Sequence, residues 1–168
     1  TVDWSSDGTA WSSTMGINSA GTVLMVRMYK STDQGRTWTY DATISGTQTN
    51  TDKQMVWVDH SATSPYKDNI YAIWHNGNPV YMNRRNSTGW LTTPIQVSGS
   101  QTTGTGIGSD VKTNSFGDVF GAWPDTTSRG IYLVKSTNGG GSYSTPVRIR
   151  TTFGGYDISH VWKSTNAG

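Results

Sequence analysis

Short runs of apolar or alternating residues recur along the chain, separated by clusters of glycine, asparagine, aspartate and serine. Residue types that favour strands, namely threonine, valine, isoleucine, tyrosine and tryptophan, dominate these runs. No segment places apolar residues at helical spacing over three turns. The pattern predicts an all-β fold in which successive strands form a meander. The apolar runs lie at residues 23–28, 55–58, 70–74, 119–123, 131–134 and 147–149.

Turn sequences repeat along the chain at a nearly constant interval. Trp38, Trp90 and Tyr143 each follow a glycine-containing turn, and they lie 52 and 53 residues apart. A second pair of segments, 69–74 and 118–123, matches at an interval of 49 residues. A repeat of about 50 residues that holds four strands is typical of one blade of a β-propeller. The sequence therefore predicts a β-propeller of four-stranded blades, with about three blades present.

The repeats divide the chain within one partial propeller domain. We expect one blade at residues 53–97 and the next at residues 108–149. Residues 1–45 are expected to form an incomplete blade that is short by one strand, and residues 151–168 to begin a further blade. The glycine- and threonine-rich stretches at 46–52 and 99–106 are expected to link blades rather than to separate domains.

One turn carries a distinctive set of polar residues. Residues 31–38 read Ser-Thr-Asp-Gln-Gly-Arg-Thr-Trp, and residues 136–143 are a softened copy. Serine and aspartate can bond to the backbone of their own turn, and glycine can adopt a positive φ. The tryptophan is expected to begin the next strand and to pack its ring inside the blade. We expect structural roles for Ser31, Asp33, Gly35, Trp38, Ser136, Asn138, Gly140 and Tyr143.

The first of these turns resembles the Asp box, the S-x-D-x-G-x-T-W repeat of the sialidase (neuraminidase) superfamily, also called the BNR repeat. Partial copies at 5–11, 86–90 and 164–168 extend the resemblance over nearly the whole chain. Residues 64–71 are similar to an SPY-x-x-N-I-Y hairpin of bacterial BNR-repeat proteins. The resemblance implies a six-bladed ring with its Asp boxes on the outer rim. It implies that this chain is a fragment or half ring, completed by a second copy or by the missing half of the propeller.

The same resemblance implies a secreted protein that hydrolyses terminal sialic acid from glycoconjugates. Three arginines would bind the substrate carboxylate, a glutamate would activate a tyrosine nucleophile, and an aspartate would act as general acid and base. All eleven acidic residues are aspartates, so the chain contains no glutamate, and no arginine triad is recognisable. Two hypotheses stay open: an exo-glycosidase completed by its parent protein, or a non-catalytic propeller that binds a glycan or a protein. No catalytic residue can be assigned.

Composition limits the partners of the chain. The net charge is +2 and the basic residues are scattered, with Arg84-Arg85 as the longest run, so no nucleic-acid partner is expected. No stretch approaches 18 apolar residues, so no membrane span is expected. The chain has no cysteine, and its three histidines share no metal-ligand spacing, so we expect neither a metal nor a cofactor. It opens at Thr1 without a basic leader, which predicts a processed or excised piece.

Candidate ligand-binding residues follow from propeller geometry, in which ligands lie near the central axis. The pattern places two acidic positions at the starts of innermost strands and two tryptophans near the ends of second strands. A tryptophan beside a polar group suits a sugar, because sugar rings stack on aromatic faces and bond through hydroxyls. The candidates are Asp52, Lys53, Trp74, His75, Asp110, Trp123 and Asp125. The alternative is that both tryptophans are repeated interblade packing residues and that Asp52 and Asp110 are turn residues.

Overall fold

The computed structural model describes residues 1–99 and 108–152. Nearly all of the predicted linker at 99–106 and of the predicted further blade at 151–168 lies outside these residues, as does the partial turn copy at 164–168.

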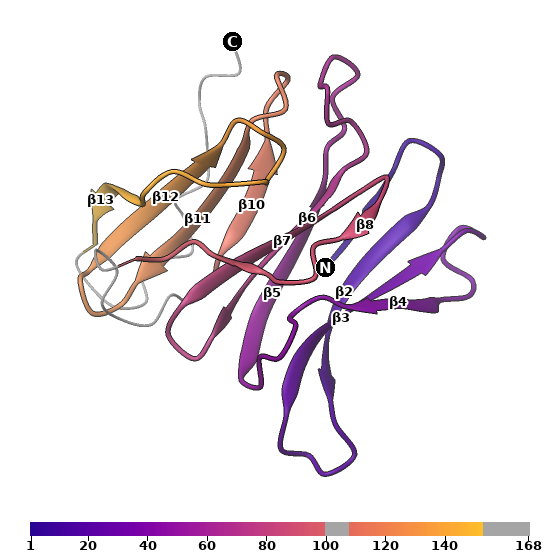
Figure 1. The fold of residues 1–168 in the computed structure, drawn as a ribbon, viewed down its shortest axis with the longest axis horizontal. Helices are drawn as coiled ribbons and strands as arrows, with labels where there is room; N and C mark the ends of the chain where they lie inside the picture. The colour runs from indigo at the N-terminus through magenta and orange to yellow at the C-terminus, as the bar shows by residue number, and fades with distance from the viewer. Residues whose placement is uncertain (100–107, 153–168) are drawn as a thin grey trace.

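The described residues form three antiparallel sheets of strands that follow chain order (Figure 1). The first blade contains β1 (Val2–Trp4), β2 (Ala10–Ile17), β3 (Leu24–Ser31) and β4 (Thr39–Thr43). The second contains β5 (Thr51–Val58), β6 (Ile70–Asn76), β7 (Val80–Asn86) and β8 (Gly89–Trp90), and β9 (Ile95–Gln96) also pairs with β7. The third contains β10 (Asp110–Thr113), β11 (Val119–Asp125), β12 (Gly130–Ser136) and β13 (Val147–Thr151). The all-β prediction is confirmed.

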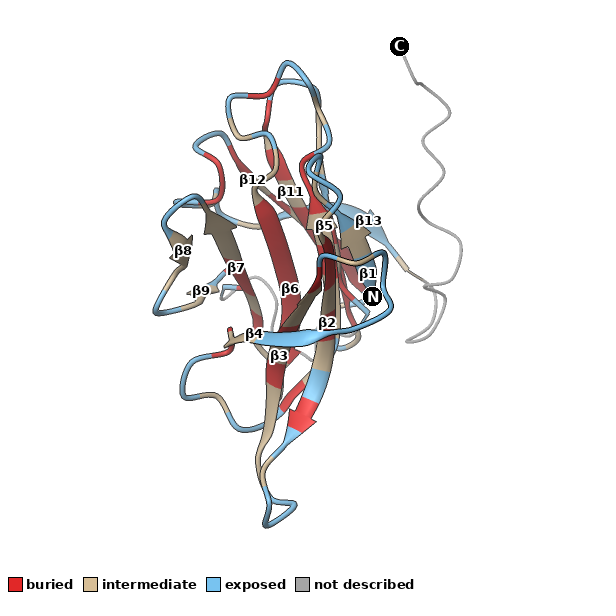
Figure 2. Cartoon of the chain, turned by 90° about the vertical axis from the view of Figure 1, so that its right-hand side faces the viewer, coloured by how far each residue is buried: buried red, intermediate tan, exposed pale blue. Residues whose placement is uncertain are grey.

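The three sheets lie side by side like the sectors of a fan (Figure 1). Each sheet begins with its innermost strand, and β5 of the second blade contacts both β1 and β10. Burial is concentrated on the long middle strands, including β6, β11 and β12, whereas most turns at the two ends are exposed (Figure 2). This arrangement brings the starts of β5 and β10 to one end of the innermost layer.

The first blade has four strands, so the prediction that residues 1–45 lack one strand is wrong. The strand that sequence reasoning missed is β1, whose three residues carry no apolar run. Bonds to the second blade hold it in place, because Asp3 Oδ2 accepts a hydrogen bond from the Val58 amide at 2.8 Å. Thr1 Oγ1 likewise accepts from the Val56 amide at 2.9 Å. Long-range contacts rather than local pattern therefore define this strand.

Two buried apolar layers hold the blades together. The layer between the first and second blades contains Trp11, Val26, Met28, Ile44, Val56, Val58, Ile70, Ala72 and Trp74. The layer between the second and third contains Tyr71, Ile73, Val80, Met82, Val97, Val111, Val119, Trp123, Tyr132 and Val134. Each middle strand alternates its side chains between the two faces of its sheet, so β6 contributes to both layers.

The loop at residues 59–69 locks the second blade onto the third. Its buried Asp59 accepts hydrogen bonds from the Ser64 hydroxyl at 2.5 Å and the Ser61 amide at 3.1 Å. The Tyr66 ring packs against Gly139 of the third blade so closely that a Cβ there would lie 2.6 Å from the ring. Only a glycine leaves room for this contact.

The two Asp-box turns have nearly the same geometry. In the first, Ser31 Oγ donates to Asp33 Oδ1 at 2.7 Å and accepts from the Gly35 amide at 2.9 Å. In the copy, Ser136 Oγ donates to Asn138 Oδ1 at 2.8 Å and accepts from the amide of Gly140 at 2.9 Å. Each turn joins the third strand of its blade to the fourth. The hydrogen bonds are local, and therefore eight residues suffice to specify the turn.

The aromatic residues that follow these turns differ in their surroundings. Trp38 is 39% exposed, and its Nε1 donates to the Gly35 carbonyl of its own turn at 3.1 Å. By contrast, Trp90 Nε1 donates at 2.9 Å to Asp41 of the first blade, and Tyr143 packs against the core between the second and third blades. The prediction that Trp38 packs inside the blade is therefore wrong. Trp90 and Tyr143 contact the preceding blade, whereas the described residues place no blade before the first that Trp38 could contact.

Candidate functional site

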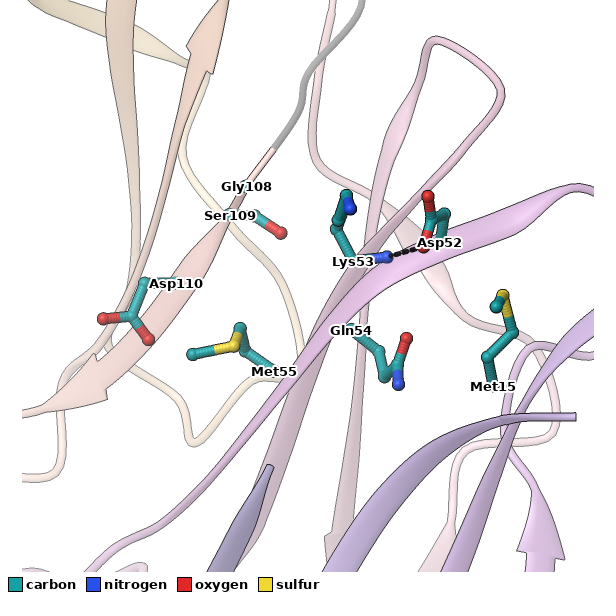
Figure 3. A pocket seen from close by; sticks show the side chains of 8 residues that line it. All are labelled: Met15, Asp52, Lys53, Gln54, Met55, Gly108, Ser109 and Asp110. Atoms are coloured by element: carbon teal, nitrogen blue, oxygen red, sulfur yellow. Dashed lines mark hydrogen bonds between the residues drawn. The ribbon is translucent and has the colours of Figure 1, made fainter. Parts of the chain in front are cut away.

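A pocket of about 550 Å³ opens where β5 and β10 begin (Figure 3). It contains three of the predicted ligand-binding residues, Asp52, Lys53 and Asp110. Its lining residues come from all three blades: Met15 of β2, Asp52, Lys53, Gln54 and Met55 of β5, and Gly108, Ser109 and Asp110 at the start of β10. The predicted starts of the innermost strands therefore converge on one pocket.

A β-bulge shapes the β5 wall of the pocket. Asp52 pairs with His75 and Met55 pairs with Ile73, so Lys53 and Gln54 together oppose one residue of β6. Lys53 has a φ of 56°, a left-handed conformation that costs a residue with a side chain roughly 1–2 kcal/mol. The Asp52 carboxylate accepts a hydrogen bond from the Lys53 amide at 2.7 Å. The bulge thus holds a lysine and a carboxylate side by side at the pocket (Figure 3).

The opposite wall contributes a hydroxyl with an unused hydrogen-bonding capacity. Ser109 is 3% exposed, and its Oγ has no hydrogen-bond partner among the described residues. Figure 3 shows this hydroxyl turned toward the gap that separates β10 from Lys53. Buried hydroxyls are nearly always bonded, and leaving one unsatisfied costs free energy. A polar group bound in the pocket would remove that cost.

Asp110 is held more tightly than Asp52. Its carboxylate accepts hydrogen bonds from the Val111 amide at 2.8 Å and from Lys112 Nζ at 2.9 Å. In Figure 3 the Asp110 carboxylate points away from Ser109. Asp110 therefore forms part of the wall, whereas Asp52, Lys53 and Ser109 surround the gap.

The structure does not support a sugar-binding role for the two candidate tryptophans. Trp74 and Trp123 are both 0% exposed. The first donates from Nε1 to Gln48 Oε1 at 2.6 Å, and the second stacks on Tyr132 with ring centroids 6.3 Å apart. Neither ring presents a face to a ligand, so that prediction is wrong. The interblade packing alternative describes them, because each lies in one of the two buried layers.

The remaining two candidates lie at the ends of strands, His75 near the end of β6 and Asp125 at the end of β11, and neither lines the pocket. His75 is 8% exposed, and its Nδ1 is hydrogen-bonded to the Gly77 carbonyl at 2.8 Å. Asp125 is 1% exposed and accepts a hydrogen bond from the Ser128 amide at 2.7 Å. The structure therefore does not bring them together with Asp52, Lys53 and Asp110, and their role in ligand binding stays a prediction.

Sequence reasoning missed four side chains of the pocket: Met15, Gln54, Met55 and Ser109. Ser109 and Gln54 had a detectable signal, because each is next to or near a predicted acidic position. Met15 had none, since its contribution depends on how the first blade packs on the second. The two methionines give the pocket its apolar surface.

Metal and membrane sites are not evident in the part of the chain that the structure describes. Residues 1–99 and 108–152 contain no group of three or more acidic or histidine side chains that could hold a metal ion. These residues also include no helix of sufficient length and apolarity to cross a membrane.

No protein-family profile matches the chain, and no curated protein is similar to it in sequence. Solved structures do match. An α-L-arabinofuranosidase from Fusarium graminearum, in complex with an iminosugar inhibitor, has a TM-score of 0.63 and 15% identity over 89% of this chain and 47% of its own. An α-L-arabinanase from Penicillium chrysogenum, complexed with arabinobiose, has a TM-score of 0.63 and 11% identity over 89% of this chain and 48% of its own. The intramolecular trans-sialidase from Ruminococcus gnavus has a TM-score of 0.57 and 14% identity over 77% and 27%.

These neighbours are carbohydrate-active β-propeller glycosidases. The chain is therefore a partial β-propeller, as its sequence predicts, and it spans about half the length of the first structures that it matches. Identities of 11–15% establish a shared fold and no particular activity.

Proposed function

We propose that this chain is the sugar-binding part of a secreted β-propeller glycosidase, and that the pocket at Asp52, Lys53 and Ser109 contacts the sugar. The observation that carries the proposal is the Ser109 hydroxyl, which has no hydrogen-bond partner among the described residues and lies in a pocket where innermost strands begin. Two of the similar enzymes hold arabinobiose or an iminosugar, which makes a glycan the ligand class to test first.

Each lining group has a place in sugar recognition. The Asp52 carboxylate accepts hydrogen bonds from sugar hydroxyls, and the Lys53 ammonium donates to ring or hydroxyl oxygens. Ser109 can donate and accept, so it can bond to either kind of oxygen. Met15 and Met55 supply flexible apolar contact for the C–H faces of the sugar ring. Such a mixture of apolar surface and a few polar groups is typical of ligand pockets.

Sialoside hydrolysis is the second candidate, and the complete Asp box favours it. The chain contains no glutamate that could activate a tyrosine nucleophile, so that chemistry needs residues from the rest of a longer protein. If neither activity exists, the pocket serves a non-catalytic module that binds glycan. Fluorogenic arabinofuranosides and sialosides separate these candidates by turnover.

We further propose that the remaining blades of a longer protein cover the outward face of the first blade. Val2, Tyr29 and Tyr40 share this face through their pairing in register with Ser12 and with each other. The exposed fractions are 47% for Val2 and 56% for Tyr40, which are high values for large hydrophobic side chains on the face of a sheet. The support is that the similar structures are about twice as long as this chain.

Calorimetric titration of the chain with arabinobiose tests the sugar-binding proposal. Lys53→Gln should weaken binding about tenfold or more, because it removes a charged donor. Lys67→Gln is the matched control, since Lys67 is exposed and lies outside this pocket. Equal affinities for the two variants would refute the assignment of the pocket.

A further inference from the structure

We propose that the pocket selects an uncharged sugar and discriminates against an acidic sugar such as sialic acid. The inference rests on the proposed function of the pocket as the sugar site, and it adds the chemical class of the sugar. Three observations support it: the charges that line the pocket, the positions of the arginines, and the hydrogen-bonding groups that face the gap.

The carboxylate that faces the gap is that of Asp52, and the Lys53 ammonium lies beside it. The Asp110 carboxylate also lines the pocket, but it pairs with the Lys112 ammonium at 2.9 Å and points away from Ser109 (Figure 3). A sugar carboxylate bound here would lie beside the Asp52 carboxylate, and like charges repel strongly where water is partly excluded. An uncharged sugar meets no such repulsion.

Arginine side chains are absent from the lining of the pocket. A carboxylate is best recognised by the planar fork of a guanidinium, which forms two parallel hydrogen bonds. Every arginine of the chain lies on a third or fourth strand of a blade or in a turn that adjoins a third strand: Arg27, Arg36, Arg84, Arg85, Arg129, Arg148 and Arg150. Among them, Arg148 is engaged by the carbonyls of Ser128 and Arg129 at 2.9 and 3.0 Å. None is placed to neutralise an acidic sugar in this pocket.

The groups that face the gap suit hydroxyls instead. Ser109 Oγ has no hydrogen-bond partner among the described residues. Asp52 Oδ1 accepts a hydrogen bond from the Lys53 amide, which leaves the second carboxylate oxygen to accept one from a sugar hydroxyl. Met15 and Met55 flank these groups with apolar surface. A neutral sugar offers both hydroxyls and C–H faces, so it complements each part of this lining.

A matched pair of ligands isolates the charge of the sugar. Calorimetry or ligand-observed NMR would compare the methyl glycoside of N-acetylneuraminic acid with the methyl ester of the same glycoside, and would include arabinobiose as a neutral sugar. We expect the ester to bind at least tenfold more tightly than the acid. Asp52→Asn should reduce that difference several-fold, because it removes the repelling carboxylate and leaves an amide of the same shape.

The outcomes separate this inference from the proposed function. If the acid binds more tightly than the ester, and Lys53→Gln abolishes that binding, the pocket is a sugar site but the inference is wrong. If no sugar binds, both the inference and the proposed function are wrong. Thermal unfolding checks that Asp52→Asn remains folded, and Asp110→Asn provides a second variant that should change the acid-to-ester ratio in the same direction.

Discussion

The contact of Gly139 with Tyr66 makes a quantitative prediction about the junction of the second and third blades. Gly139 is buried at a φ of 64°, and a Cβ there would lie 2.6–2.8 Å from three atoms of the Tyr66 ring. Gly139→Ala therefore adds a left-handed backbone penalty of about 1–2 kcal/mol and an overpacking penalty of about 1–3 kcal/mol. The lower entropy of the unfolded chain offsets about 0.4–1 kcal/mol. The net loss of stability should be about 1–4.6 kcal/mol.

Urea unfolding followed by tryptophan fluorescence measures this loss. Gly8→Ala is the matched control, because Gly8 has a φ of 84° and no atom within 4 Å of its Cβ position. Gly8→Ala should show only the backbone penalty. In a Tyr66→Leu background, Gly139→Ala should cost less than in the parent chain, since the smaller side chain can move aside. If Gly139→Ala costs no more than Gly8→Ala, the ring contact does not stabilise the junction.

Three further predictions concern the first Asp-box turn, the β-bulge in β5 and the outward face of the first blade. Hydrogen bonds from Thr37 lower the pKa of Asp33 to about 2. The stabilisation that they give is therefore present above about pH 4 and is lost as the pH falls to about 2. In acid unfolding, the stability of Asp33→Asn should not show this loss between about pH 4 and about pH 2. Lys53→Gly should raise the free energy of unfolding by about 1 kcal/mol while weakening arabinobiose binding, as urea titration and calorimetry would show. Trp4 shares the exposed face with Val2, because the two residues are two positions apart on β1. Trp4→Ser with Tyr40→Ser should reduce any self-association that sedimentation detects, whereas a discrete dimer of the parent chain would indicate that a second copy covers this face.

Local chemistry explains which parts of the fold the sequence predicts. The hydrogen bonds of Ser31 and Asp33 stay within eight residues, so the pattern of the turn is enough to identify it and its copy. The surroundings of Trp38 depend on a neighbouring blade, and no local pattern reports on that neighbour. The strand at Val2–Trp4 was missed for the same reason, because side-chain bonds to β5 support it.

In the candidate site too, local sequence predicts some positions, whereas others depend on how the blades pack. The positions of Asp52 and Asp110 at the pocket were predictable, because polar residues recur in the sequence at the starts of the innermost strands. Trp74 was assigned the wrong role, since a position in sequence does not reveal which of two covered faces a side chain occupies. Both faces of β6 are buried, so adjacent residues there enter different interblade layers.

Trp90 and Tyr143, which follow the turns of the second and third blades, both contact the preceding blade, and this gives the row of blades a direction. Trp90 donates to Asp41 of the first blade, and Tyr143 packs against the core between the second and third blades. If one blade unfolds, the aromatic residue of the following blade therefore loses its contact. The aromatic residue of the preceding blade does not depend on the unfolded blade and keeps its own contacts. Damage in such a tandem array should spread more readily toward the carboxyl end than toward the amino end.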